Sequence, residues 1–170
     1  KLHVGIACGG TGGHTYPGLA VAETLKERGH RVTVWISGKD IENKTLDSWS
    51  GDVVRIHAEG FQFGFSWKSL RTLYQLFLGL LSAIPILRRD RPDIILAMGS
   101  YSSFAPVAGA IVLRIPYILH EANVIPGRLV SMMTAKANAI AVVSGNRFNI
   151  STTAFGTGNF DVFAKAVIQP

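Results

Sequence analysis

Short runs of apolar, often β-branched residues alternate along this chain with longer segments in which apolar residues recur at helical spacing. The short runs predict strands at residues 2–8, 31–37, 52–57, 93–98, 116–120 and 138–143. The longer segments predict helices at residues 17–28, 67–89, 103–113 and 126–136, with Pro17 in the first turn of the first helix. Strands that alternate with helices pair in parallel through right-handed crossovers. The pattern therefore predicts an α/β fold built on a Rossmann-like, doubly wound parallel sheet.

Three polar loops stand where strands of this predicted sheet end. They occupy residues 9–14, 99–103 and 120–123. Ligands of open α/β sheets bind beyond the carboxyl ends of the strands. We therefore expect the three loops to converge on one binding edge.

The first of these loops reads Gly-Gly-Thr-Gly-Gly-His at residues 9–14 and joins a strand to a helix. Glycines let backbone amides approach a ligand, and together with the N-terminus of the next helix such amides form an anion site suited to a diphosphate. His14 stands where a Walker A loop needs Lys, and Thr15 stands where the dinucleotide fingerprint needs its third Gly. Tight packing of the strand against the helix is the alternative explanation for these glycines.

Composition narrows the class of protein. A chain of 170 residues with 48% apolar and 16% charged residues is expected to form one globular domain, which excludes a disordered or disulfide-dense protein. Its single cysteine, Cys8, has no partner in the chain for a disulfide, which fits a reducing compartment. A net charge of +6 leaves nucleic acid, anionic lipid or a phosphorylated substrate as partners.

The predicted helix at 67–89 is apolar on more than one face. An apolar stripe repeats at three- and four-residue steps through Leu70, Leu73, Tyr74, Phe77, Leu81 and Ile84. One face must pack on the sheet, and a second face, flanked by cations, is expected to lie on an anionic membrane; this predicted membrane face comprises Trp67, Lys68, Arg71, Leu78, Leu80, Arg88 and Arg89. The apolar stretch at 74–87 is interrupted and shorter than the roughly 20 residues of a spanning helix. Pro85 is expected to kink or end the helix.

Three motifs together resemble the MurG-type family of bacterial N-acetylglucosaminyltransferases. They are Gly-Gly-Thr-Gly-Gly-His at 9–14 with Pro-Gly-Leu-Ala-Val-Ala at 17–22, Met-Gly-Ser-Tyr-Ser-Ser at 98–103, and His-Glu-Ala-Asn at 120–123. The resemblance implies the N-terminal half of a GT-B glycosyltransferase. Residues 1–163 would form the acceptor-binding, membrane-side domain and 164–170 the start of an interdomain linker, with the UDP-sugar domain outside this chain. Ala122 replaces the usual Gln, and Val162 stands where the family has an Arg.

The activity implied by the resemblance is inverting transfer of N-acetylglucosamine from UDP-N-acetylglucosamine to undecaprenyl-diphosphate-linked N-acetylmuramoyl-pentapeptide, which converts lipid I to lipid II in cell-wall synthesis. The implied partners are these two substrates, a C-terminal domain in cis or in trans, and the anionic inner leaflet. The implied location is peripheral, on the cytoplasmic side of the bacterial membrane. No cofactor, metal ion or nucleic acid is expected.

Such a displacement needs a base for the attacking hydroxyl and positive potential for a diphosphate. His14 is the candidate base, since imidazole titrates near neutral pH and a helix N-terminus disfavours its charged form; capping the helix or binding a diphosphate oxygen are its alternative roles. The resemblance places donor binding at Thr11, Gly12, Gly13 and Asn123, and acceptor diphosphate binding at Gly10, Gly13, His14, Gly99, Ser100, Tyr101, Ser102 and Ser103. His120 and Glu121 would support the site. Glu121 is also an alternative base, Asn123 an alternative helix N-cap, and Tyr101 an alternative surface aromatic.

Two other functions compete with this interpretation. The chain could be a non-catalytic, membrane-recruiting subunit of a split glycosyltransferase, or part of a related transferase for another lipid acceptor. A nucleic-acid-binding module is disfavoured, because the chain has no basic patch with interleaved aromatic residues and no nucleic-acid-binding motif.

Overall fold

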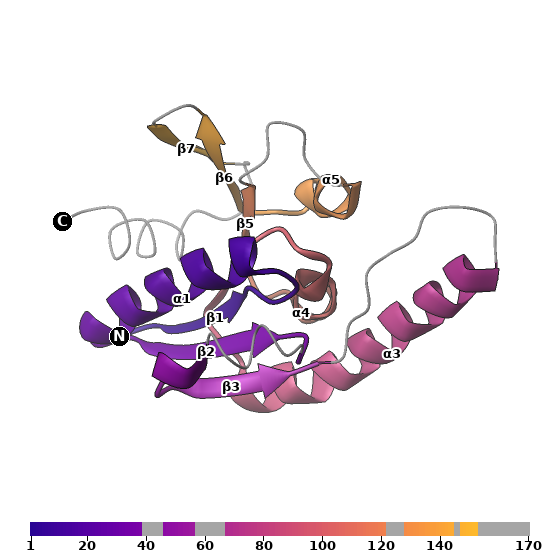
Figure 1. Cartoon of the computed structure of the whole chain (residues 1–170), viewed down its shortest axis with the longest axis horizontal. Helices are drawn as coiled ribbons and strands as arrows, with labels where there is room; N and C mark the ends of the chain where they lie inside the picture. Colours follow the sequence, from indigo (N-terminus) through magenta and orange to yellow (C-terminus); the bar gives the residue numbers. More distant parts are fainter. Residues whose placement is uncertain (39–45, 57–66, 122–127, 145–146, 153–170) are drawn as a thin grey trace.

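The computed structural model describes residues 1–38, 46–56, 67–121, 128–144 and 147–152 (Figure 1). In these residues one sheet has the strand order β3-β2-β1-β4-β5-β6-β7. Its parallel strands are β1 (His3–Ala7), β2 (Arg31–Ile36), β3 (Asp52–Arg55), β4 (Ile94–Ala97), β5 (Tyr117–Glu121) and β6 (Ala139–Ser144), and the edge strand β7 (Arg147–Thr152) is antiparallel to β6. The first six strands follow the order of a doubly wound dinucleotide-binding sheet. The predicted fold class is therefore confirmed.

The helices are α1 (Gly12–Glu27), α3 (Trp67–Asp90), α4 (Phe104–Leu113) and α5 (Arg128–Thr134), with short 3₁₀ turns η1 (Leu46–Ser48) and η2 (Tyr101–Ser103). The prediction that Pro17 opens the first helix was wrong. The helix starts at Gly12, inside the glycine loop, so Pro17 lies in its second turn. Sequence analysis also missed β7, which pairs with only one strand at the edge of the sheet.

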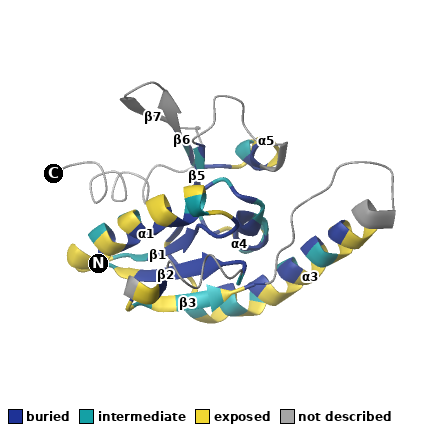
Figure 2. Cartoon of the chain, viewed as in Figure 1, coloured by how far each residue is buried: buried dark blue, intermediate teal, exposed yellow. Residues whose placement is uncertain are grey.

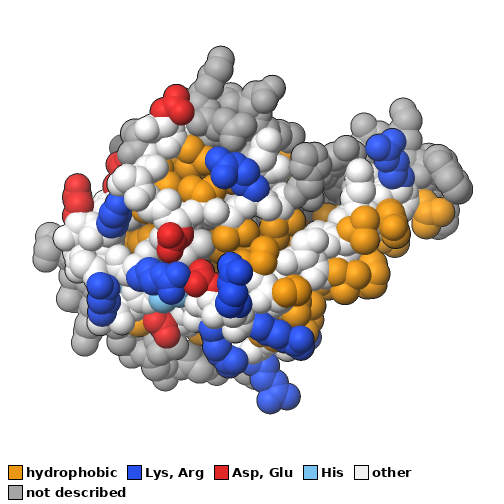
Figure 3. Space-filling model, turned by 90° about the horizontal axis from the view of Figure 1, so that it is seen from below, with side chains coloured by type: hydrophobic (Ala, Val, Ile, Leu, Met, Phe, Trp, Pro, Cys, Tyr) orange, Lys and Arg blue, Asp and Glu red, His pale blue; other side chains and the backbone are white. Residues whose placement is uncertain are grey.

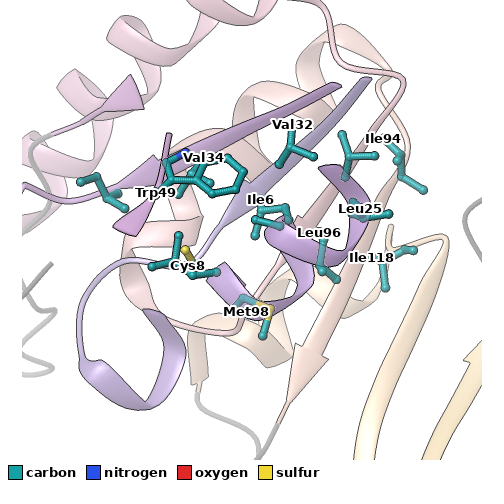
Figure 4. Close-up of a cluster of buried hydrophobic side chains, with 14 of the residues drawn as sticks. Ile6, Cys8, Leu25, Val32, Val34, Trp49, Ile94, Leu96, Met98 and Ile118 are labelled. Atoms are coloured by element: carbon teal, nitrogen blue, oxygen red, sulfur yellow. The ribbon is translucent and has the colours of Figure 1, made fainter. Parts of the chain in front are cut away.

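Alternate residues of the strands pack on opposite faces of the sheet. On one face, Leu25 of α1 lies in the same buried cluster as Val4 and Ile6 of β1 and Cys8, which directly follows that strand (Figure 4). On the other face Ala7, Ile95 and Leu119 meet residues of α3, α4 and α5. Because helices cover both faces, the central strands β1, β2 and β4 are almost wholly buried and dark in Figure 2, whereas the outer strand β3 is partly exposed. Ligands can then reach the sheet only at its edges and ends.

Helix α3 packs on α4 through small and medium side chains. Thr72, Leu76, Ala83 and Leu87 of α3 are buried. A Cβ atom on Gly109 of α4 would lie 2.6 Å from Leu87 Cδ1, so the two helices approach closely because this glycine has no side chain. The predicted apolar stripe lies elsewhere on α3: its large side chains are exposed, namely Leu70, Leu73, Tyr74, Phe77 and Leu81.

Pro85 lies inside α3 and does not end it, since the helix continues to Asp90. A kink at this proline stays a prediction. Within the described residues, Leu70–Asp90 is long and apolar enough to cross a membrane by length and composition alone, with a mean hydropathy of 1.5 over an 18-residue window. The expectation that this stretch is too short was therefore wrong. A mostly buried core helix meets the same criterion, but only 28% of this window is buried: Ala83 and Leu87 pack in the domain core, and the other side of α3 is exposed.

Candidate functional site

The candidate site lies at the carboxyl edge of the sheet, where the strand order reverses. Strand β1 pairs with β2 on one side and with β4 on the other. The strands that follow β1 are added first on the β2 side and then, from β4 onward, on the opposite side. Such a reversal leaves a crevice beyond the strand ends, which is where doubly wound folds bind ligands. The loops after β1 and β4 and the end of β5 are adjacent at this edge, as predicted.

Two glycines with left-handed backbone allow these loops to interlock. Gly10 has φ +105°, and a Cβ atom there would overlap the Ser100 hydroxyl of the next loop. Gly99 has φ +88°, and a Cβ atom there would lie 2.7 Å from the His120 carbonyl oxygen. Each position therefore favours glycine twice, for its dihedral angle and for lack of space. The three loops form one packed unit.

The serine hydroxyls of the second loop are used inside this unit. Ser103 Oγ donates to the Ala7 carbonyl at 3.0 Å, and Ser100 Oγ lies 2.7 Å from Ser102 Oγ and accepts from the Ser102 amide at 3.1 Å. All three serines are buried. These side chains, predicted as diphosphate ligands, thus have partners within the fold and hold the loop against β1.

His14 lies in the first turn of α1, at the N-terminal end that faces the site. Its Nδ1 is 2.8 Å from Thr11 Oγ1, which fixes one ring nitrogen and leaves Nε2 for another partner. Burial removes water from the ring and lowers the pKa of His14 below its usual value, while the Glu121 carboxylate opposes this shift. The direction agrees with the sequence-based expectation, but desolvation is the largest cause. At neutral pH the ring is therefore uncharged.

His120 and Glu121 end strand β5 beside this histidine. Glu121 is only 4% exposed. Burial lowers the pKa of His120, the Glu121 carboxylate raises it, and the charge of His14 lowers it further. All three groups lie at the carboxyl edge, His14 in the first turn of α1 and the other two at the end of β5. Within the described ranges, no three His, Cys, Asp and Glu side chains come together in a way that could hold a metal ion.

Tyr101 is partly buried at the start of η2, and the other remaining predicted residues divide into three groups. Thr11 and Gly13 are exposed and Gly12 is partly buried at the start of α1, where the first amides of a helix have no acceptor within it. Asn123 lies outside the described residues. On α3, Arg71, Leu78, Arg88 and Arg89 are exposed and Leu80 is partly buried, whereas the side chains of Trp67 and Lys68 are outside the described part.

Sequence analysis did not single out Tyr16. Its side chain is 63% exposed, and its ring carbon Cε2 would be 3.4 Å from a Cβ atom on Gly12, so it lies beside the exposed amides of α1. The sequence signal that could have identified Tyr16 is its position as an aromatic residue in the first turns of a helix that follows a glycine loop.

Comparison with known proteins identifies a family. Residues 4–142 match the model of the glycosyltransferase family 28 N-terminal domain. A protein from Carboxydothermus hydrogenoformans named UDP-N-acetylglucosamine--N-acetylmuramyl-(pentapeptide) pyrophosphoryl-undecaprenol N-acetylglucosamine transferase is 34% identical over 142 residues, which cover 82% of this chain and 38% of that protein. A protein of the same name from Rhodospirillum rubrum is 36% identical over 146 residues, covering 83% and 36%. The chain thus spans about two fifths of the length of these relatives.

Solved structures agree with this result. The crystal structure of MurG from Acinetobacter baumannii superposes with a TM-score of 0.75 at 25% identity, covering 95% of this chain and 48% of that one. A UDP-N-acetylglucosamine 2-epimerase superposes with a TM-score of 0.66 at 19% identity, covering 85% and 42%, which shows a shared fold only.

Proposed function

Because the chain belongs to glycosyltransferase family 28, we propose that it is the acceptor-binding half of a transferase that moves N-acetylglucosamine from UDP-N-acetylglucosamine to a diphosphate-linked lipid acceptor. The acceptor would be the undecaprenyl-diphosphate-linked N-acetylmuramoyl-pentapeptide named in the relatives. The observation that carries this proposal is the interlocked set of loops at the sheet reversal, with His14 at the start of α1. Residues 1–163 would form this half and 164–170 would lead to a UDP-sugar domain.

The reaction displaces UDP from the sugar. An acceptor hydroxyl attacks the anomeric carbon, the bond from that carbon to the UDP oxygen breaks, and the hydroxyl proton must pass to a base. His14 is suited to this role because its ring is neutral at pH 7. Its Nε2 can accept the proton only if Nδ1 carries a hydrogen and donates to Thr11 Oγ1. The contact with Thr11 would then select the reactive tautomer.

The diphosphate of the acceptor would bind at the start of α1. The amides of Gly12 and Gly13 are among the first of the helix, and the helix dipole adds positive potential there. Since the Ser102 amide donates to Ser100 and the Ser103 hydroxyl donates to the Ala7 carbonyl of β1, the second loop would mainly position the first one. His120 and the buried Glu121 would support His14 by setting its electrostatic environment.

The test is transfer of labelled N-acetylglucosamine to the lipid acceptor by the full protein that carries this chain. We expect His14→Ala to lower kcat by about 10²–10⁴-fold with little change in acceptor KM, the loss typical of a general base. Protonated His14 accepts no proton, and burial lowers the pKa of His14, so in the wild type kcat should fall only at a pH lower than the ordinary histidine value of about 6.5.

His30 is the matched control, since it follows α1 at the end far from the site and binds the Leu2 amide through Nδ1. His30→Ala should leave kcat unchanged. A rise in KM with unchanged kcat in His14→Ala would make His14 a diphosphate-binding residue. Full activity in His14→Ala would refute the assigned site.

Peripheral attachment to the cytoplasmic face of the bacterial membrane is part of the same proposal. The exposed apolar side chains of α3 form a continuous row, with Arg88 and Arg89 exposed near its C-terminal end (Figure 3). Apolar side chains flanked by cations favour binding to an anionic surface.

Flotation with anionic and with neutral vesicles tests this attachment. Binding to anionic vesicles should fall several-fold in Leu81→Ser and in Arg88→Glu, and neutral vesicles should bind less protein. Val112→Ser is the matched control, because Val112 is an equally exposed apolar residue on α4. Unchanged flotation of the folded α3 variants would contradict the attachment.

A further inference from the structure

An apolar groove of about 820 Å³ lies along the N-terminal half of α3. Its walls include Leu73, Tyr74, Phe77 and Leu80 of α3 and Phe104 of α4, and Arg71 is the charged residue among its described lining residues. The volume lies within the roughly 300–1,000 Å³ of typical ligand sites. Figure 3 shows the hydrophobic side chains gathered along this part of α3.

The groove adjoins the second loop of the candidate site through the chain itself, and that loop packs against the first loop at Gly10. Phe104 follows Ser103 directly, so the groove wall is one residue away from the loop that is bonded to β1. Consecutive Cα atoms are about 3.8 Å apart. A ligand with a polar end at the loops and an apolar end in the groove would therefore pass along Phe104.

The shape and chemistry of the groove favour a hydrocarbon chain. Its residues on α3 run from Leu70 to Leu80, about 15 Å along the helix axis. A helix pairs its interior amides and carbonyls within itself, so this wall offers no backbone hydrogen bonds to an extended peptide. It offers apolar contact along its length and the Arg71 cation, which suits a ligand that joins an apolar chain to an anionic group.

We propose that this groove binds the prenyl chain of the lipid acceptor next to its diphosphate; this inference rests on the proposed function. The enzyme would then hold part of the lipid in a protein groove, in addition to resting on the bilayer. Leu78 and Leu81 separate the two roles, because both are exposed on α3 and neither lines the groove. Leu78 and Leu81 belong only to the surface that meets the membrane, whereas Leu73 and Phe77 also contact the chain.

Calorimetric titration of this 170-residue chain, without lipid or detergent, tests the inference. The probes are inorganic diphosphate, farnesyl diphosphate and farnesol, the last two below the concentration at which they aggregate. Farnesyl diphosphate should bind at least about tenfold more tightly than inorganic diphosphate, because its chain leaves water. Farnesol should bind in the groove with lower affinity than farnesyl diphosphate.

Groove variants and matched controls locate the effect. In Phe77→Ser and Leu73→Ser, farnesyl diphosphate should bind at most about twofold more tightly than inorganic diphosphate, and inorganic diphosphate should bind as it does in the wild type. Leu78→Ser and Leu81→Ser should keep the full gain. Circular dichroism of each variant checks that it is folded.

The outcomes separate this inference from the proposed function. Equal binding of farnesyl diphosphate and inorganic diphosphate, or a gain that survives in Phe77→Ser, overturns the groove assignment alone. Binding of farnesol with none of inorganic diphosphate overturns the diphosphate site and leaves the groove. Failure of all three probes overturns both. Dimerisation that Phe77→Ser abolishes, with no gain from the prenyl chain, would assign the groove to a second copy and overturn the inference.

Discussion

The loops at the carboxyl edge and the exposed face of α3 are both candidate binding surfaces, yet they are built in opposite ways. The loops are held by left-handed glycines and by hydrogen bonds such as that from Ser103 to Ala7. The face of α3 consists of large apolar side chains, such as Leu73 and Phe77, that are more than half exposed. A site for chemistry needs fixed dipoles, whereas a surface for lipid needs apolar area and tolerates many arrangements.

The largest expected difference lies within α3 itself. Leu87→Ala should lower the free energy of unfolding by about 2–5 kcal/mol, because Leu87 is fully buried against α4. Leu81→Ala should change it by less than about 0.5 kcal/mol, because the Leu81 side chain is 48% exposed. Urea unfolding measures both. Similar losses in the free energy of unfolding of the two variants would contradict this contrast, because they would show that Leu81 is also packed.

Glycine substitutions should separate the crowded loops from ordinary turns. Gly99→Ala should destabilise by about 2–3 kcal/mol, since it adds overlap with the His120 carbonyl to left-handed strain. Gly29→Ala is the control: φ is +82° there, but a Cβ atom would meet nothing within 4 Å, so only strain of about 1 kcal/mol remains. Thermal or urea unfolding gives both values. Equal costs would mean that the loops are not interlocked.

Two serines that donate to backbone carbonyls provide a smaller contrast. Ser103→Ala should cost about 1 kcal/mol, because its buried hydroxyl ties the second loop to β1. Ser82→Ala should be within about 0.5 kcal/mol of wild type, because Ser82 bonds to Leu78 on the exposed side of α3. A larger loss at Ser82 than at Ser103 would reverse the comparison.

The smallest expected effect is a dependence of stability on pH. Burial lowers the pKa values of His14 and His120, so the unfolded chain binds more protons than the folded one near pH 6. Stability should be fully present above about pH 6.5 and decline as the pH falls through the lower folded values. Urea unfolding at pH 7.5 and 5.5 measures this, and His120→Gln should reduce the decline. A chain that becomes more stable at pH 5.5 would contradict these directions. Helix α3 contains no histidine, and its Asp90 bears on the effect only through His3, whose pKa burial also lowers and this carboxylate opposes.

Much of the site could be predicted because it depends on local pattern and parallel topology. The loops after β1, β4 and β5 meet because parallel strands end on one side of a sheet. The roles of their side chains could not be predicted. Ser103 and Ala7 are 96 residues apart in sequence, so they come into contact only after β1 and β4 are paired. The start of α1 was also missed, because glycine is a poor helix former in isolation and Gly12 is helical only in this context.

The sequence by itself determined the alternation of strands and helices and the edge at which the polar loops gather, because periodicity and chain order specify these. The tertiary structure decided which side of α3 is buried. That helix is apolar on several sides, so hydrophobicity alone selects none of them. The missing side chain of Gly109 leaves room for Leu87 beside Ala83, so this side of α3 packs on α4 and the opposite side remains exposed.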